Sequence, residues 1–192
     1  RLFIAEEQRH ARNLGRFLAL NDIPLVSTTF TDRVFRRLRH VFGGLEISIA
    51  VLITAEIIAK VYYAVLRETT QSAILRRHCD QILCDELRHV QFQAEQLAKL
   101  CVSRRWLGLV TATGLQRFLY LGTTVVVWFF HRQVIRRGGL SLRGWWRSCW
   151  REFNAAFAGP GPNMSLQPTP RTETDCLGSA VVAVPTAAEV ER

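Results

Sequence analysis

The chain has 192 residues, of which 48% are hydrophobic and 21% are charged, and its formal net charge is +9. This length and composition suffice for one packed domain with appendages and exclude global disorder. Nearly all basic residues are arginine, but no nucleic-acid-binding motif accompanies them, so we expect a solvated basic face and no nucleic-acid partner.

The cysteines are five in number and widely spread, without any CxxC pair. An odd number without such pairs argues against a zinc ribbon and against a disulfide scaffold. No short apolar run follows a basic start, so the sequence shows no secretory signal. We therefore expect a protein of the reducing cytoplasm.

The first predicted helix covers residues 1–20, which carry apolar side chains at helical spacing. It is already under way at the first residue, so we expect N-terminal structure upstream of this sequence. Residues 21–31 contain Pro24 and several turn formers and predict a break, after which Asp32 is placed to cap a second helix. This second helix is predicted over residues 33–68.

The helix over 33–68 is apolar enough to suggest a membrane span. Glu46, Glu56 and Lys60 interrupt it, however, and such residues are costly in lipid. A buried helix of a bundle is the better interpretation. Residues 71–102 predict a further helix after a short link near Thr69, so these two helices should be antiparallel neighbours.

The C-terminal half predicts two more helices and a tail. Residues 104–135 form an apolar helix whose uninterrupted apolar run, 118–130, is too short to span a bilayer. A following segment repeats tryptophans among arginines; it is either a membrane-surface helix or a helix that caps the bundle, and we favour packing. Residues 159–192 are rich in Pro, Gly, Ser and Thr and predict disorder.

Two Glu-x-x-His motifs carry the chemistry: Glu7 with His10, and Glu86 with His89. Residues three apart lie on one face of a helix, so each pair can reach one metal ion. Between the motifs, Glu56 stands alone among aliphatic residues, where an unpaired carboxylate is costly. Metal ions would neutralise these carboxylates, and the mixture of carboxylate and imidazole favours iron, with manganese as an alternative.

This pattern resembles the ferritin-like di-iron carboxylate superfamily, whose bundles use a lone Glu from two helices and Glu-x-x-His from two others. The resemblance covers residues 1–103. It implies an all-α, ferritin-like four-helix bundle in which residues 1–103 supply the second, third and fourth helices. Residues 104–158 would then be additional helices that pack on the bundle, and 159–192 a disordered tail.

The resemblance also implies a ligand set for two iron ions: Glu7, His10, Glu56, Glu86 and His89. The lone Glu of the first helix has no counterpart here, since the sequence starts within the second, and we expect it upstream. No catalytic residue beyond these ligands is predicted.

Several neighbouring residues compete for roles at the site. We expect Glu6 to be exposed, whereas Asp85 is either an acceptor for an imidazole N–H or an ordinary solvated residue. Tyr63 lies two turns from Glu56, where packing is favoured over a role with the metals. Glu46 is the alternative to Glu56, but it lies about 80° around the helix.

The implied function is activation of dioxygen to oxidise or hydroxylate a small organic substrate, in a monomer or homodimer. One alternative is an iron-handling protein, either a ferroxidase or a peroxide-removing protein. The other is a metal-free bundle that serves as an interaction or membrane-surface module through Trp145, Trp146 and Trp150.

Overall fold

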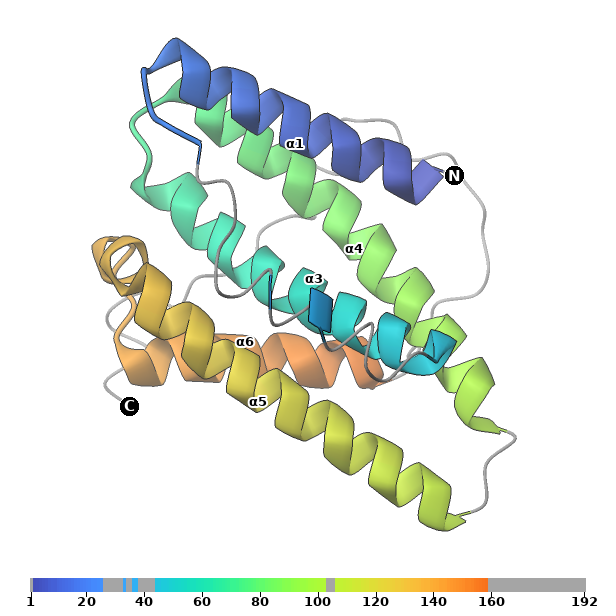
Figure 1. Ribbon diagram of the computed structural model, residues 1–192. Coiled ribbons are helices and arrows are strands. Elements are labelled where there is room, and N and C mark those ends of the chain that lie inside the picture. The colour runs from blue at the N-terminus through green and yellow to red at the C-terminus, as the bar shows by residue number, and fades with distance from the viewer. Residues whose placement is uncertain (1, 26–32, 34–35, 38–43, 103–105, 159–192) are drawn as a thin grey trace.

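The computed structural model describes residues 2–25, 33, 36–37, 44–102 and 106–158. Within these residues the regular structure is helical, with no strand, which confirms the prediction of an all-α fold (Figure 1). The helices are α1 (Leu2–Leu20), α3 (Leu45–Thr69), α4 (Ala73–Val102), α5 (Trp106–Arg137) and α6 (Leu142–Phe157).

The central helix is α3, which packs against α4 on one side and against α5 and α6 on the other (Figure 1). α4 follows α3 after a short link in which Thr70 is extended, and it runs back along α3. The side chains of Ile53, Ile57, Val61 and Val65 fill the core from α3. α1 lies along α4, so that α1, α3 and α4 surround a common interior.

The second helix does not run from residue 33 to residue 68 as predicted. α3 begins at Leu45, and Gly44 before it is extended, with φ −99° and ψ 148°. The physical reason is the glycine pair Gly43–Gly44, since glycine loses the most backbone entropy in a helix. Asp32, the predicted cap, and the predicted disordered tail over 159–192 lie outside the described residues.

The tryptophan-rich helix α6 buries its apolar side against α3 and α5. Trp145 is fully buried, and its indole N–H donates to the carbonyl oxygen of Thr124 in α5 at 3.1 Å. Lys60 of α3 is buried and forms an ion pair with the partly buried Glu152 of α6, with Nζ and Oε2 2.9 Å apart. This charged residue of α3, which argued against a membrane span, therefore has its partner inside the protein.

The turn between α5 and α6 depends on two glycines. Gly139 has φ +80°, a left-handed conformation that other residues adopt only with strain. Gly138 lies so close to α3 that a side chain there would collide with Val65. The amide of Leu140 then donates to the carbonyl oxygen of Ile135 at 3.2 Å, which closes the end of α5.

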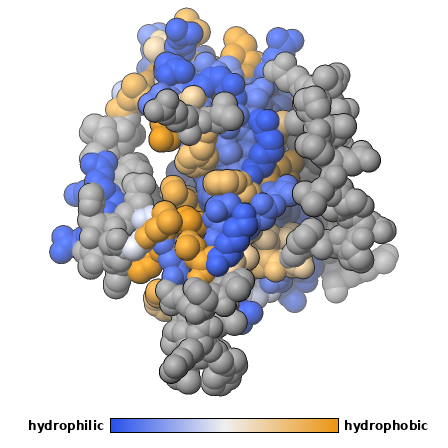
Figure 2. All heavy atoms as spheres, turned by 90° about the vertical axis from the view of Figure 1, so that its right-hand side faces the viewer, coloured by the Kyte–Doolittle hydropathy of each residue, from blue (hydrophilic) through white to orange (hydrophobic). Residues whose placement is uncertain are grey.

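Two described helices, α3 and residues 114–137 of α5, are long and apolar enough to cross a membrane by length and composition. In α3, 56% of the most apolar stretch is buried within the protein, as in a core helix. For α5 only 28% is buried, and the 24-residue segment includes the polar residues Arg117, His131 and Arg132 that bound the apolar run 118–130. Figure 2 shows apolar side chains at the surface among polar ones on one face of the molecule.

Candidate metal centre

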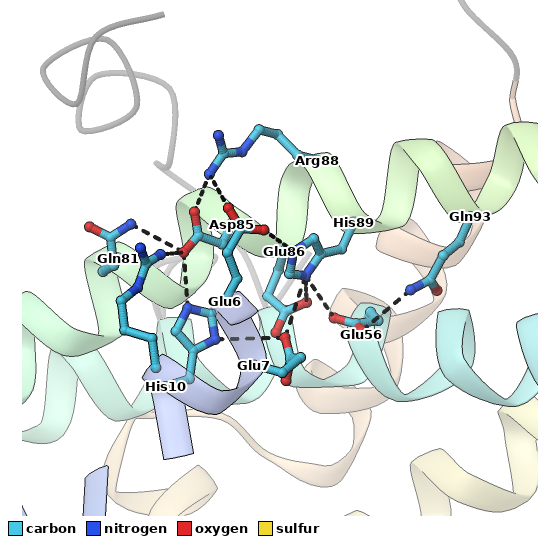
Figure 3. A network of polar contacts seen from close by, with 11 residues as sticks. Glu6, Glu7, His10, Glu56, Gln81, Asp85, Glu86, Arg88, His89 and Gln93 are labelled. Carbon is cyan, nitrogen blue, oxygen red and sulfur yellow. Dashed lines mark hydrogen bonds and ion pairs between the residues drawn. The ribbon is translucent and has the colours of Figure 1, made fainter. Parts of the chain in front are cut away.

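Four of the five predicted ligands converge on one point between α1, α3 and α4. Glu7, Glu56, Glu86 and His89 each offer one ligand atom, and these atoms all lie within 4.8 Å of one another (Figure 3). α1 supplies Glu7, α3 supplies Glu56, and α4 supplies both Glu86 and His89 through the three-residue spacing of its motif. The helices therefore assemble a site that no single segment could form.

The distances within this group suit a cation at its centre. Nδ1 of His89 lies 3.5 Å from Oε1 of Glu7, 3.5 Å from Oε2 of Glu86 and 3.7 Å from Oε2 of Glu56. Ligands about 2.1 Å from one ion are separated by roughly 3 to 4.2 Å, depending on the angle between them. Small side-chain adjustments would therefore bring the four atoms to bonding distance.

Three of these atoms are buried and have no hydrogen-bond partner: Oε1 of Glu7, Oε2 of Glu86 and Nδ1 of His89. A buried polar atom without a partner costs about 1 to 3 kcal/mol, and charged groups cost more. Because three such atoms converge on one point, a cation bound there would remove this free-energy cost from all three. The residues present therefore fit a metal ion.

The outer nitrogen of each motif histidine is held by a carboxylate from the other helix (Figure 3). Nε2 of His89 donates to Oε2 of Glu6 at 2.9 Å, and Nε2 of His10 donates to Oδ2 of Asp85 at 2.9 Å. Because a neutral imidazole carries one N–H, this arrangement leaves the lone pair on Nδ1 for a metal. Each of the two helices thus supplies the carboxylate that orients the motif histidine of the other.

Glu6 is the residue that the sequence misjudged, because it was expected to be exposed. Its side chain is only 21% exposed, since it turns toward His89 and also faces Arg88. Asp85 is fully buried and accepts from His10, Arg9 and Arg88, which makes it an imidazole acceptor and not a solvated residue. On each helix one acidic residue faces the cluster, and the acidic residue before it binds the histidine of the other helix. This division of roles was not visible in either motif alone.

The charge of Asp85 is well compensated despite its burial. Burial by itself would raise the pKa of this carboxyl, but hydrogen bonds from Gln81, His10 and Arg88, with the charge of Arg88, lower it below 3.8. Asp85 therefore stays ionised at neutral pH and holds His10 in the tautomer with Nε2 protonated.

His10 lies beside the group of four, not within it. Its Nδ1 is 3.7 Å from Oε1 of Glu7, the same oxygen that lies near Nδ1 of His89. Glu7 is therefore located between the two histidines, where a carboxylate could serve two ions. Burial, and next the charge of Glu56, raise the pKa of Glu7.

Two further residues, Gln93 and Tyr63, lie near the site. Gln93, one turn after His89, is buried, and its amide donates to Oε1 of Glu56 at 3.4 Å; the sequence offered no pattern for it. Tyr63 packs with Ala64 and Leu83, and burial raises its pKa to about 12.

No protein family, curated protein or solved structure matches this chain significantly. The class of site is therefore defined by its own side chains: a carboxylate-rich, histidine-containing cluster inside an all-helical protein.

The metal-free protein should lose stability as the pH rises above neutrality. Burial lowers the pKa of His89, but the carboxylates of Glu56 and Glu6 outweigh this effect and raise it above 6.5. Protonated His89 thus stabilises the fold. This contribution is complete at pH values below the pKa of His89 in the unfolded chain, and it is lost as the pH rises through the higher pKa of His89 in the folded protein. Urea unfolding at about pH 6 and about pH 9 should show the decline.

The matched variants are His89→Gln and, on the same helix, His78→Gln. Because the raised pKa of Glu7 acts in the same direction, His89→Gln should reduce the decline, whereas His78→Gln should keep it in full. A decline of equal size in His89→Gln would contradict the assignment to His89.

Proposed function

We propose that this chain is a ferritin-like di-iron carboxylate protein that activates dioxygen to oxidise a small organic substrate. In this proposal α1, α3 and α4 correspond to the second, third and fourth helices of such a bundle. The observation that carries it is the convergence of three partnerless buried atoms, from Glu7, Glu86 and His89, with Glu56. The mutual bracing of the two Glu-x-x-His motifs supports it.

Each residue has a defined part in this proposal. Glu56, Glu86 and His89 would hold one iron ion, and Glu7 would lie between that ion and a second one at His10. Glu6 and Asp85 keep the histidines in the tautomer that binds metal. Iron, when bound, supplies the redox chemistry that reduces dioxygen, which carboxylate side chains alone cannot do.

The site is partly open to small molecules at Glu7, whose side chain is 42% exposed, whereas Glu56 and Glu86 are buried. Dioxygen and a substrate would therefore approach from the side of α1. The carboxylates of Glu56 and Glu86 are shielded from water, which strengthens their attraction for a cation.

The test is anaerobic addition of ferrous iron to the purified chain, followed by air. We expect close to two irons bound per chain and a new ferric absorption band that forms with consumption of oxygen. Iron that accumulates far beyond this ratio would favour the ferroxidase alternative. Absence of stoichiometric iron, with manganese also unbound, would reject a di-iron site formed by these five residues and leave a metal-free bundle.

A further inference from the structure

The outer side of α5 presents an apolar stripe to solvent. Leu115, Phe118, Val125 and Phe129 are between 39% and 76% exposed. Their spacing of three, seven and four residues, with Gly122 in between, places them on one side of the helix. Single exposed apolar residues are normal at a protein surface, but four large apolar side chains along one side of a helix form a continuous patch.

The opposite side of α5 is already occupied by the protein. Tyr120, Thr124 and Trp128 are buried there, and the hydroxyl of Tyr120 donates to the carbonyl oxygen of Cys149 in α6 at 2.6 Å. The amide of Gln116 donates to the hydroxyl of Thr54 in α3 at 3.0 Å. A helix that is packed on one side and apolar on the other is suited to lie in a membrane surface, not to cross the bilayer.

The charge of this part of the chain is strongly one-sided. Residues 106–157 contain one acidic residue, Glu152, which pairs with Lys60 of α3. The same residues contain no lysine and seven arginines: Arg117, Arg132, Arg136, Arg137, Arg143, Arg147 and Arg151. Arg132 and Arg136 follow Phe129 at helical spacing and are exposed, so the apolar stripe continues into a basic end.

We propose that α5 docks the protein flat on an anionic lipid bilayer. The side chains of Leu115, Phe118, Val125 and Phe129 enter the boundary between headgroups and acyl chains. Arg132 and Arg136 contact the lipid phosphates. The complementary charge selects a lipid surface over a second copy of this chain, because residues 106–157 contain no acidic residue besides Glu152, which pairs with Lys60, to meet the arginines of another copy. This proposal does not depend on the metal site.

The test is co-sedimentation of the purified full chain with phosphatidylcholine vesicles, with and without phosphatidylglycerol. We expect binding to the anionic vesicles that decreases with salt. The variant Phe118→Ser/Val125→Ser/Phe129→Ser should bind more than about tenfold more weakly. Arg132→Gln/Arg136→Gln should bind about 30-fold more weakly to anionic vesicles and unchanged to neutral ones.

The matched control is Leu20→Ser/Ile74→Ser/Phe92→Ser, which removes equally exposed apolar side chains from α1 and α4. It should bind like the parent chain, and the helical circular dichroism of all variants should be unchanged. Equal loss in the control, or no loss in the α5 variant, would overturn the proposal. So would a dimer in light scattering that the α5 variant dissociates, without vesicle binding, since that result identifies a self-association surface.

Discussion

Replacing Glu86 and His89 together with alanine should lower the affinity for ferrous iron by more than about a hundredfold. Loss of a single residue that only supports a ligand typically costs 10- to 100-fold, and this variant removes two of the four converging ligands. The remaining pair, Glu7 and Glu56, comes from different helices and leaves the cluster with two carboxylates and no imidazole. Anaerobic titration calorimetry measures the affinity directly.

The control for this double variant is Glu95→Ala/His131→Ala, which makes the same chemical changes on α4 and α5 outside the cluster. Glu95 and His131 are both exposed. Its iron affinity should equal that of the parent chain. A comparable loss in both variants would show that the iron binds elsewhere, and an unchanged affinity in Glu86→Ala/His89→Ala would exclude the cluster as the binding site.

Replacing Trp145 with alanine should destabilise the fold by about 3 to 5 kcal/mol. Its indole is fully buried between α6 and the rest of the core, and its N–H bonds to α5. The substitution removes both the largest buried side chain of α6 and the partner of the Thr124 carbonyl. The free energy of unfolding from urea titration, followed by circular dichroism, measures the loss.

The neighbouring Trp146→Ala is the matched control, because Trp146 has the same side chain but is 37% exposed. We expect a loss of about 1 kcal/mol or less. Equal effects at the two positions would contradict the packing of α6. The burial of Trp145 also means that the tryptophan segment cannot present all three indoles to a membrane, which removes the expected basis for a surface role of Trp145.

Periodicity predicted the helices well because each one keeps a continuous apolar side. The isolation of Glu56 among aliphatic residues and the two Glu-x-x-His motifs were sufficient to identify the four residues that converge. The positions of these residues along α3 and α4 follow from the short link near Thr69. Local spacing and loop length therefore carry most of the information about the cluster.

Other features depend on how the helices are rotated against one another, which the sequence does not encode locally. The bond from His89 to Glu6, and that from His10 to Asp85, form only when α1 lies on α4 in one register. Gln93 becomes relevant only once α3 is in place beside it. The start of α3 was predicted too early because the apolar pattern continues on both sides of Gly44. The prediction therefore gave too little weight to the free-energy cost of two adjacent glycines within a helix.

The attachment of α1 has a consequence for local opening of the protein. None of the described α1 side chains belongs to the hydrophobic clusters of the core. α1 is held to α4 by polar contacts around Asp85 and His89, together with an edge contact of the Phe3 ring on His89. Its amide hydrogens should therefore exchange with deuterium sooner than those of α3. An ion bound by Glu7 and His89 would tie α1 to α4, so metal occupancy should appear as slowed exchange in a helix that the core does not anchor.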